Sequence, residues 1–268
     1  MALHEAGYEI PLVVSQPDRR RGRGKSLMPS PVKAAAVELG LTVTDEVDDV
    51  LEVDADLAVV VAFGRLIKRH VLEQVPMVNL HFSLLPRWRG AAPVERAILA
   101  GDETTGVCLM ELAEELDAGG IYRVAEVPIA STATLDGLRN ELVDIGTSLL
   151  LEALANGLGP AAPQVGEVVV AKKIRSDELR LDLDKSADEL HRVIRLGGAW
   201  LEFRGKRLRL WEAEPVADGP APGVVVDSVL GTGQGGLELI NVQPEGKQQM
   251  TAQAWLNGAQ MESDERLN

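Results

Sequence analysis

The sequence lacks several features that define other classes of protein. It has one cysteine, Cys108, in 268 residues, which excludes an internal disulfide and a cysteine-rich zinc site. Its longest apolar run, LAVVVAF at 57–63, is far shorter than the roughly 18 residues of a membrane span. The start, MALHEAGYEI, lacks the basic region and apolar core of a secretory signal. These absences predict a soluble protein of the reducing cytoplasm with no membrane partner.

Positive charge is also scarce over the chain as a whole. Lys and Arg number 27 against 41 Asp and Glu, and the formal net charge of −14 argues against broad attraction to nucleic acid. Any such binding must come from a local patch of cations. What is present is a globular composition, with 46% hydrophobic and 25% charged residues, and a length sufficient for two domains.

Strands alternate with helices over the first part of the chain, which predicts an α/β domain. Strands are expected at 8–16, 41–45, 56–63, 75–83, 106–113 and 119–129, and helices at 2–7, 30–40, 93–101 and 134–157. Ser30 is the expected N-cap of the second helix, and the basic stretch 17–30 is expected to be a loop. The strand 56–63 is apolar throughout, as in a parallel sheet covered on both faces.

The pattern changes after a Gly-, Pro- and Ala-rich stretch at 156–167. A helix at 186–197, capped by Ser186, is followed by short strands separated by turns, which indicate a small closed or sandwiched β-domain. The strands are expected at 200–205, 206–216, 223–229, 235–244 and 248–258. We therefore expect a catalytic domain over 1–156, a linker over 157–180 and a β-domain over 181–268.

The glycines of GTGQGG, residues 231–236, match the spacing of a dinucleotide-binding loop. That loop opens a helix, whereas this segment leads into LELINV, another strand. The segment is therefore expected to be a hairpin turn with positive φ angles.

Asn79 and His81 are the first candidates for chemistry. In an extended strand they point to the same face, and α/β sheets bind ligands beyond the carboxyl ends of their strands. Asp117 lies in ELDAGG, a turn expected to leave its side chain facing a cleft. An amide, an imidazole and a carboxylate suit acyl transfer to an amine, because Asn79 and His81 can donate to the oxyanion and Asp117 can fix the imidazole tautomer.

Spacing alone leaves a structural alternative open, because a histidine near a strand end is more often a hydrogen-bonded core or rim residue than a catalyst. No serine or cysteine carries a local nucleophile signature, which favours direct transfer between two bound substrates. The other histidines, His4, His70 and His191, are expected on helix surfaces, and their spacing gives no metal-binding pair. We expect no metal site.

Several segments together resemble the 10-formyltetrahydrofolate-dependent formyltransferases, and among them the methionyl-tRNA formyltransferase family. The resemblance covers nearly the whole chain and rests on SQPDRRRGRGKSLMPSPVK, VVVAFG, NLHFSLLPRWRGAAPVERAILAGDETTGV, ELDAGG, FRGKRLRLWEA and VQPEGKQQMTAQAWLNG. It implies a doubly wound, mostly parallel Rossmann-like sheet followed by an oligonucleotide-binding-like β-barrel. It also implies that Asn79, His81 and Asp117 are catalytic and that 10-formyltetrahydrofolate is the formyl donor. The implied folate pocket is lined by Ala62, Phe63, Gly64, Ser83, Leu84, Leu85 and Pro86, and 87–90 are the expected rim between the folate and tRNA ends of the site.

Six cations and no acid lie between residues 19 and 33, on an otherwise acidic chain. Such a run is usually only a solvated loop. Beside a formyltransfer site, the resemblance implies that it binds the initiator tRNA, with Arg23 entering the acceptor end, and that FRGKRLRL in the β-domain follows the tRNA backbone. The implied tRNA-binding residues are Arg19, Arg20, Arg21, Arg23, Lys25, Lys172, Arg204, Lys206 and Arg207.

The resemblance implies that a monomer transfers the formyl group to the free amino group of methionine on initiator methionyl-tRNA. One alternative is transfer to a small amine, such as a nucleotide sugar or glycinamide ribonucleotide, which needs the trio of Asn79, His81 and Asp117 but neither the basic run nor the β-domain. Another is an inactive tRNA-binding remnant, because family members begin with a strand, a Gly-Thr-Pro loop and most of a helix before the segment that matches LHEAGYEI. That strand would be central in the sheet, so its absence is expected to expose backbone groups and apolar surface. Phe82 stands where the family often has glycine and is expected to crowd the site.

Overall fold

The computed structural model describes residues 1–20, 27–262 and 265–268, and the contacts within the chain divide it into two units. Unit 1 comprises Met1–Ala91, Gly106–Val127 and Leu142–Val170, and unit 2 comprises Ala92–Thr105, Pro128–Glu141 and Ala171–Asn268. In the part of the chain that the structure describes, no helix has the length and apolar character needed to cross a bilayer.

The main sheet of unit 1 is mixed. Its four strands are ordered β5 (Ala58–Val61), β6 (Met77–His81), β8 (Thr104–Glu111) and β9 (Ile121–Pro128). β5 runs parallel to β6, as expected, whereas β8 is antiparallel to β6. β8 lies next to β6 in the sheet order. Its antiparallel pairing with β6 makes this a Rossmann-like mixed sheet, rather than the mostly parallel sheet that was expected.

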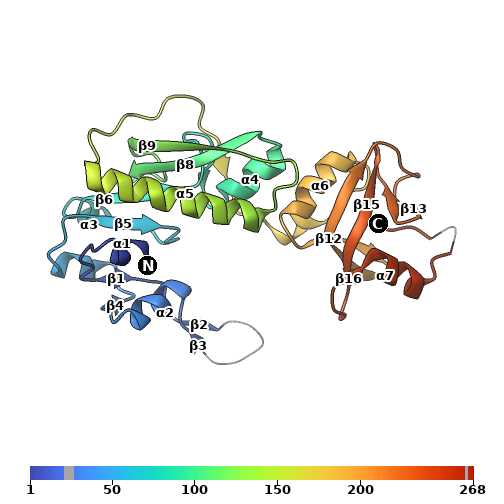
Figure 1. Ribbon diagram of the computed structural model, residues 1–268, viewed down its shortest axis with the longest axis horizontal. Helices are drawn as coiled ribbons and strands as arrows, with labels where there is room; N and C mark the ends of the chain where they lie inside the picture. Colours follow the sequence, from blue (N-terminus) through green and yellow to red (C-terminus); the bar gives the residue numbers. More distant parts are fainter. Residues whose placement is uncertain (21–26, 263–264) are drawn as a thin grey trace. The chain divides into compact units, whose positions relative to one another are not determined.

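The two faces of β6 are covered by different parts of unit 1. Leu80 faces α5 (Leu135–Asn156), where it lies near Gly146, and Figure 1 shows this helix running along the sheet. Met77 lies on the other face and packs against Val71 of α3 (Arg69–Leu72). Alternation along the strand therefore places Asn79 and His81 on the face opposite α5, and all five residues of β6 are buried.

The expectation that 56–63 is buried on both faces is wrong. Among the described strands, β5 is at the edge of the four-stranded sheet and pairs only with β6, and its residues are half-buried or exposed. Val61 is 45% exposed. An apolar sequence alone does not distinguish a central strand from an edge strand, because both can carry Val and Ala on both faces.

The first 52 residues of unit 1 form short elements. A two-stranded parallel sheet joins β1 (Val13–Val14) to β4 (Val43–Thr44), which is much less strand than predicted at 8–16. The helices are α1 (Ala2–Glu5), α2 (Pro31–Glu38) and the 3-10 helix η1 (Asp48–Glu52). Ser30 caps α2 as expected, because its side chain accepts a hydrogen bond from the Lys33 backbone N–H at 2.9 Å.

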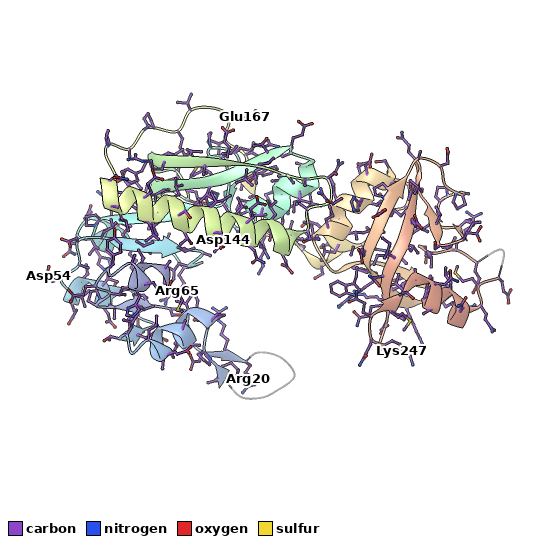
Figure 2. The ribbon with its side chains drawn as sticks, in the orientation of Figure 1. Arg20, Asp54, Arg65, Asp144, Glu167 and Lys247 are labelled. Atoms are coloured by element: carbon purple, nitrogen blue, oxygen red, sulfur yellow. The ribbon has the colours of Figure 1, made fainter. Side chains whose placement is uncertain are left out.

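The basic stretch is a hairpin where the structure describes it, rather than the predicted loop. β2 (Arg19–Arg20) pairs antiparallel with β3 (Leu27–Met28), and Figure 2 shows Arg20 on this hairpin. The side chain of Gln16 joins the start of this hairpin to the segment after β5. Its Nε2 donates to the Phe63 carbonyl at 2.6 Å, and its Oε1 accepts from the Arg19 side chain at 3.1 Å. The predicted tRNA-binding residues Arg21, Arg23 and Lys25 lie outside the described residues.

Unit 2 holds a six-stranded sheet. Its order is β11 (Ala199–Phe203), β12 (Lys206–Val216), β15 (Gly236–Pro244), β14 (Val229–Gly231) and β13 (Val225–Val226), with β16 (Met250–Thr251) also pairing β15. Each pairing in this sheet is antiparallel. The expected β-rich domain is therefore confirmed, but over the described residues the pairing does not close into a barrel.

Two helices complete the core of unit 2. α6 (Ala187–Arg195) begins with the predicted Ser186 cap, whose side chain accepts from the Glu189 backbone N–H while the Glu189 carboxylate accepts from the Ser186 backbone N–H. Leu190 of α6 and Trp255 of α7 (Ala252–Ala259) are both buried in this core. The remaining elements of the chain are α4 (Pro93–Ala100), β7 (Arg89–Gly90), β10 (Val170–Ala171) and the 3-10 helix η2 (Ser176–Leu179).

The predicted turn at 231–236 and the predicted strand at 248–258, both in unit 2, have different outcomes. GTGQGG forms the predicted turn, in which Gly231 pairs with Gly236 and Gly235 has a φ of 76°. The predicted strand over 248–258 is wrong beyond Thr251, because α7 begins there. The Thr251 side chain accepts a hydrogen bond from the Ala254 backbone N–H at 3.3 Å, and this cap starts a helix rich in Ala.

Candidate active site

His81 is fixed at the carboxyl end of β6 by two neighbours. Its Nε2 lies 2.9 Å from the Trp88 carbonyl oxygen, and its Nδ1 lies 3.6 Å from Oδ2 of Asp117. A carbonyl oxygen only accepts hydrogen bonds, so Nε2 carries a proton and Nδ1 is the ring atom that can take one up. The distance of 3.6 Å is too long for a hydrogen bond, so the Asp117 carboxylate faces Nδ1 without bonding to it.

Asp117 is held in a loop against the end of β8. Its Oδ2 accepts a hydrogen bond from the Gly90 backbone N–H at 2.8 Å, and its side chain is 11% exposed. Two residues later, a Cβ added at Gly119 would lie 2.0 Å from the carbonyl oxygen of Glu111. Only glycine permits this approach, so the first glycine of the GG pair brings the Asp117 loop against β8.

Asn79 lies two residues before His81 on the same face of β6. Its side chain is buried with 8% exposure, and no hydrogen bond joins its amide to another described residue. Its amide atoms are not among the fully buried side-chain atoms of the described residues that lack a hydrogen-bond partner, so the amide remains open to water or to a ligand. The Asn79 side chain can therefore donate to an oxygen that enters beside His81.

Cys108 pairs with His81 across the β6–β8 ladder, so the two side chains share a face. The cysteine is fully buried, and it packs against Leu85 and Met110. Burial raises the pKa of the Cys108 thiol, and a hydrogen bond with the Leu85 backbone offsets this only in part. The thiol therefore stays protonated near neutral pH and is not an activated nucleophile beside the histidine.

The expectation that Phe82 crowds the site is wrong. Alternation turns Phe82 to the face opposite His81, where its Cε1 would lie 3.6 Å from a Cβ added at Gly146 of α5. Phe82 therefore packs toward the helix that covers the other face of the sheet.

The two segments predicted to bind folate follow neighbouring parallel strands. Ala62 to Gly64 follow β5, and Ser83 to Pro86 follow β6. Because Val61 pairs with Leu80, both segments leave the sheet at the carboxyl ends of these two parallel strands. Ala62 and Gly64 are exposed, whereas Ser83, Leu85 and Pro86 are buried. The Ser83 hydroxyl donates to the Arg87 carbonyl at 2.7 Å, so it stabilises its own turn.

The predicted tRNA-binding residues of unit 2 have different surroundings. Arg204 donates from Nε and Nη2 to the two carboxylate oxygens of Glu265, each at 2.6 Å, and this lowers the pKa of Glu265 to about 2. Arg207 instead lies over Trp200, with Cζ 4.2 Å from the ring centroid. Lys172 and Lys206 are exposed.

Two further observations bear on ligands. Among the described residues, no group of three or more His, Cys, Asp or Glu side chains is placed to hold a metal ion. An open cavity of about 730 Å³ in unit 2 is lined by residues such as Arg180, Leu183 and Arg266, and none of the trio lines it.

Two backbone groups that hold His81 and Asp117 are not predicted from the sequence. They are the Trp88 carbonyl and the Gly90 N–H, in a segment expected to be the rim of the pocket. Gly90 has a φ of 121°, a conformation that favours glycine, so the glycine of PRWRG was the available signal for a special backbone geometry at this point.

Comparison with known proteins gives consistent matches over both units. The model of the formyl transferase family matches residues 1–154, and that of the formyl transferase C-terminal domain matches 173–260. A methionyl-tRNA formyltransferase from Symbiobacterium thermophilum is 40% identical over 294 residues, covering 100% of this chain and 90% of the relative. One from Cutibacterium acnes is 39% identical over 291 residues, covering 97% and 92%. The crystal structure of an N-formyltransferase from Helicobacter canadensis, in complex with folinic acid and dTDP-3-aminofucose, has a similar fold, with a TM-score of 0.67, 16% identity and 93% coverage of each chain.

Proposed function

The chain belongs to the formyl transferase family, and we propose that it transfers the formyl group of 10-formyltetrahydrofolate to the amino group of methionine on initiator methionyl-tRNA. The observation that carries this proposal is the identity of about 40% with methionyl-tRNA formyltransferases over nearly the whole of this chain. Within the formyl transferase family, a matching C-terminal domain and a basic hairpin favour tRNA over a small amine as the acceptor.

The proposed reaction makes one bond and breaks one. The methionine amine attacks the formyl carbon, a new C–N bond forms, and the bond between the formyl carbon and N10 of the folate breaks. The amine loses one proton and N10 gains one, so no oxidant, reductant or metal is needed for the balance.

Each member of the trio has a separate proposed role. Asn79 donates its amide hydrogen to the formyl oxygen as negative charge develops there. His81 takes up the proton of the attacking amine at Nδ1, because its Nε2–H is engaged with the Trp88 carbonyl. Asp117, 3.6 Å from Nδ1, stabilises the ring once it is protonated.

We propose that the formyl donor is held by the segments 62–64 and 83–86. Their position beyond the carboxyl ends of β5 and β6 supports this, because His81 ends one of these strands. Ala62 and Gly64 are exposed and have φ angles of 46° and 68°, so backbone N–H and C=O groups in this segment are open to a ligand beyond the carboxyl ends of the strands. When bound there, the folate supplies the formyl group.

The test of the function is direct. Purified protein is incubated with 10-formyltetrahydrofolate and initiator methionyl-tRNA, and formylated is separated from unformylated aminoacyl-tRNA. We expect formylmethionyl-tRNA, and inhibition of the reaction by uncharged initiator tRNA. Absence of product from protein that unfolds cooperatively would contradict the proposal. Formylation of a small amine that uncharged tRNA does not inhibit would favour the alternative acceptor.

We propose that the tRNA contacts Arg19 and Arg20 of the hairpin and Lys172, Arg204, Lys206 and Arg207 of unit 2. The outward-facing arginines of β12 alternate with the buried Leu208 and Leu210, so they lie on the solvent face of the sheet. Trp200 pairs with Arg209 on the neighbouring strand and adds an aromatic surface there. Arginine beside an aromatic ring suits a nucleic-acid backbone and its bases.

Replacing Arg207 with alanine is expected to raise the KM for tRNA without changing the KM for the folate. If Arg207 contacts one phosphate, the salt dependence of tRNA binding should also fall by about one unit of slope. Steady-state kinetics at several salt concentrations measure both effects. Arg204→Ala is the matched comparison, and it should have the smaller effect because Glu265 already offsets the charge of Arg204.

We also propose the boundaries predicted from the sequence, with a catalytic domain over 1–156, a linker over 157–180 and a tRNA-binding domain over 181–268. An oligonucleotide-binding-like β-barrel fold for the last of these, a monomeric state and a cytoplasmic location complete the proposal. The pair of family models, which match residues 1–154 and 173–260 separately, supports the division into two domains.

A further inference from the structure

The stretch after α5, predicted as the start of a linker, is hydrogen-bonded to unit 1 at both of its ends. Ala162 and Ile121 exchange two backbone hydrogen bonds, of 2.7 and 2.9 Å. The Val169 carbonyl accepts from the Arg89 backbone N–H at 2.9 Å. Figure 1 shows the segment returning from α5 past β9, and Figure 2 labels Glu167 on it. The residues between these two attachments are therefore held next to the loops of the site.

Gln164 lies between the two attachments, and its side-chain amide is fully used. Nε2 donates to the carbonyl oxygens of Asp117, at 2.8 Å, and Gly119, at 2.9 Å. Oε1 accepts from Nε and Nη2 of Arg89, at 3.0 and 2.8 Å. One side chain thus joins the loop that carries Asp117 to the segment that carries Arg89.

The segment around Arg89 is the same one that holds His81. Trp88 supplies the carbonyl that fixes Nε2 of His81, and Gly90 supplies the N–H that binds the Asp117 carboxylate. The Arg89 side chain is 14% exposed. It donates to Gln164 and also, from Nη1, to the Glu115 carboxylate at 3.2 Å. Gln164 therefore connects the supports of His81 with those of Asp117.

Asp117 needs such support, because its φ of 49° is in the left-handed region, which non-glycine residues adopt at a cost. Gln164 donates to the carbonyl oxygens of Asp117 and Gly119, the residues before and after Ala118. We infer that Gln164 is a positioning residue for formyl transfer, holding the Asp117 loop so that its carboxylate stays beside Nδ1 of His81. This inference rests on the proposed function.

Two substitutions of similar size separate the contacts of Gln164. Gln164→Met keeps the length of the side chain and removes all four hydrogen bonds. Gln164→Glu keeps an oxygen for Arg89 but loses both donors to the Asp117 loop. Because displacement of a catalytic group by about 1 Å can cost up to about 100-fold, we expect both variants to lower kcat by about 10- to 100-fold with the KM values for tRNA and folate unchanged. Gln74→Ala, which removes an exposed bond to the His70 carbonyl on α3, is the control and should keep wild-type kinetics.

The outcomes are distinguishable from failure of the function itself. If the wild-type protein forms no formylmethionyl-tRNA, the proposed function is wrong. If the wild type is active and Gln164→Glu keeps its kcat, the donors to the Asp117 loop are not needed and the inference is overturned. A rise in KM, or a loss of activity that follows a lowered melting temperature in both variants, would also overturn it, because a positioning role lowers kcat in a folded protein.

Discussion

Replacing His81 with glutamine is expected to lower kcat for formyl transfer by about two to four orders of magnitude, because proton transfer by a positioned side chain contributes about that much. The amide nitrogen of glutamine reaches the position of Nε2 and can still donate to the Trp88 carbonyl. The substitution therefore removes the group that accepts a proton while keeping the contact that orders the segment after β6.

The measurement is single-turnover formylation at saturating tRNA and folate, together with thermal unfolding. The melting temperature should change little, since the buried volume and the hydrogen bond to Trp88 are kept. His70→Ala is the control, because His70 lies on α3 with its side chain 47% exposed and should not affect the rate. A His81→Gln protein that retains more than a tenth of the wild-type rate would exclude His81 as the proton acceptor.

Replacing Gly119 with alanine should lower both stability and kcat. The new Cβ would lie 2.0 Å from the Glu111 carbonyl oxygen, so the loop must move away from β8. Overpacking of this kind typically costs about 1–3 kcal/mol. Because Gly119 is two residues from Asp117, the same movement carries the carboxylate away from His81 and slows the reaction.

Urea unfolding and steady-state kinetics together test this effect. The matched control is Gly258→Ala in α7, where no atom lies within 4 Å of an added Cβ. There the change should stabilise the protein slightly, because alanine favours a helix by about 0.5–1 kcal/mol over glycine. If Gly119→Ala has wild-type stability and rate, the close contact with β8 is not what places Asp117.

The sequence was sufficient for the parts of the site that depend on local geometry. A strand has a period of two whatever its neighbours, so Asn79 and His81 had to share a face once 75–83 was identified as a strand. The same holds for the helix caps at Ser30 and Ser186, where the side chain bonds to the backbone three residues later.

Features that depend on distant parts of the chain could not be predicted in this way. The burial of β5 depends on how many strands pair with it, which its own apolar residues do not specify. Gln164 is 47 residues from Asp117, and nothing in its Gly- and Pro-rich surroundings indicates that the segment crosses back over the site. The sequence does not predict the start of α7, because the alternating polar and apolar residues after Gln248 are typical of a strand, whereas the Thr251 cap favours a helix.

The pairing of Cys108 with His81 has a practical consequence for following the site in solution. Since this is the one thiol in the sequence and it is fully buried, a thiol reagent can reach it only when the residues that cover its face of the sheet, such as Leu85, move away. The rate at which the chain takes up one equivalent of reagent therefore reports the opening of the sheet face that carries Asn79 and His81, without any introduced label.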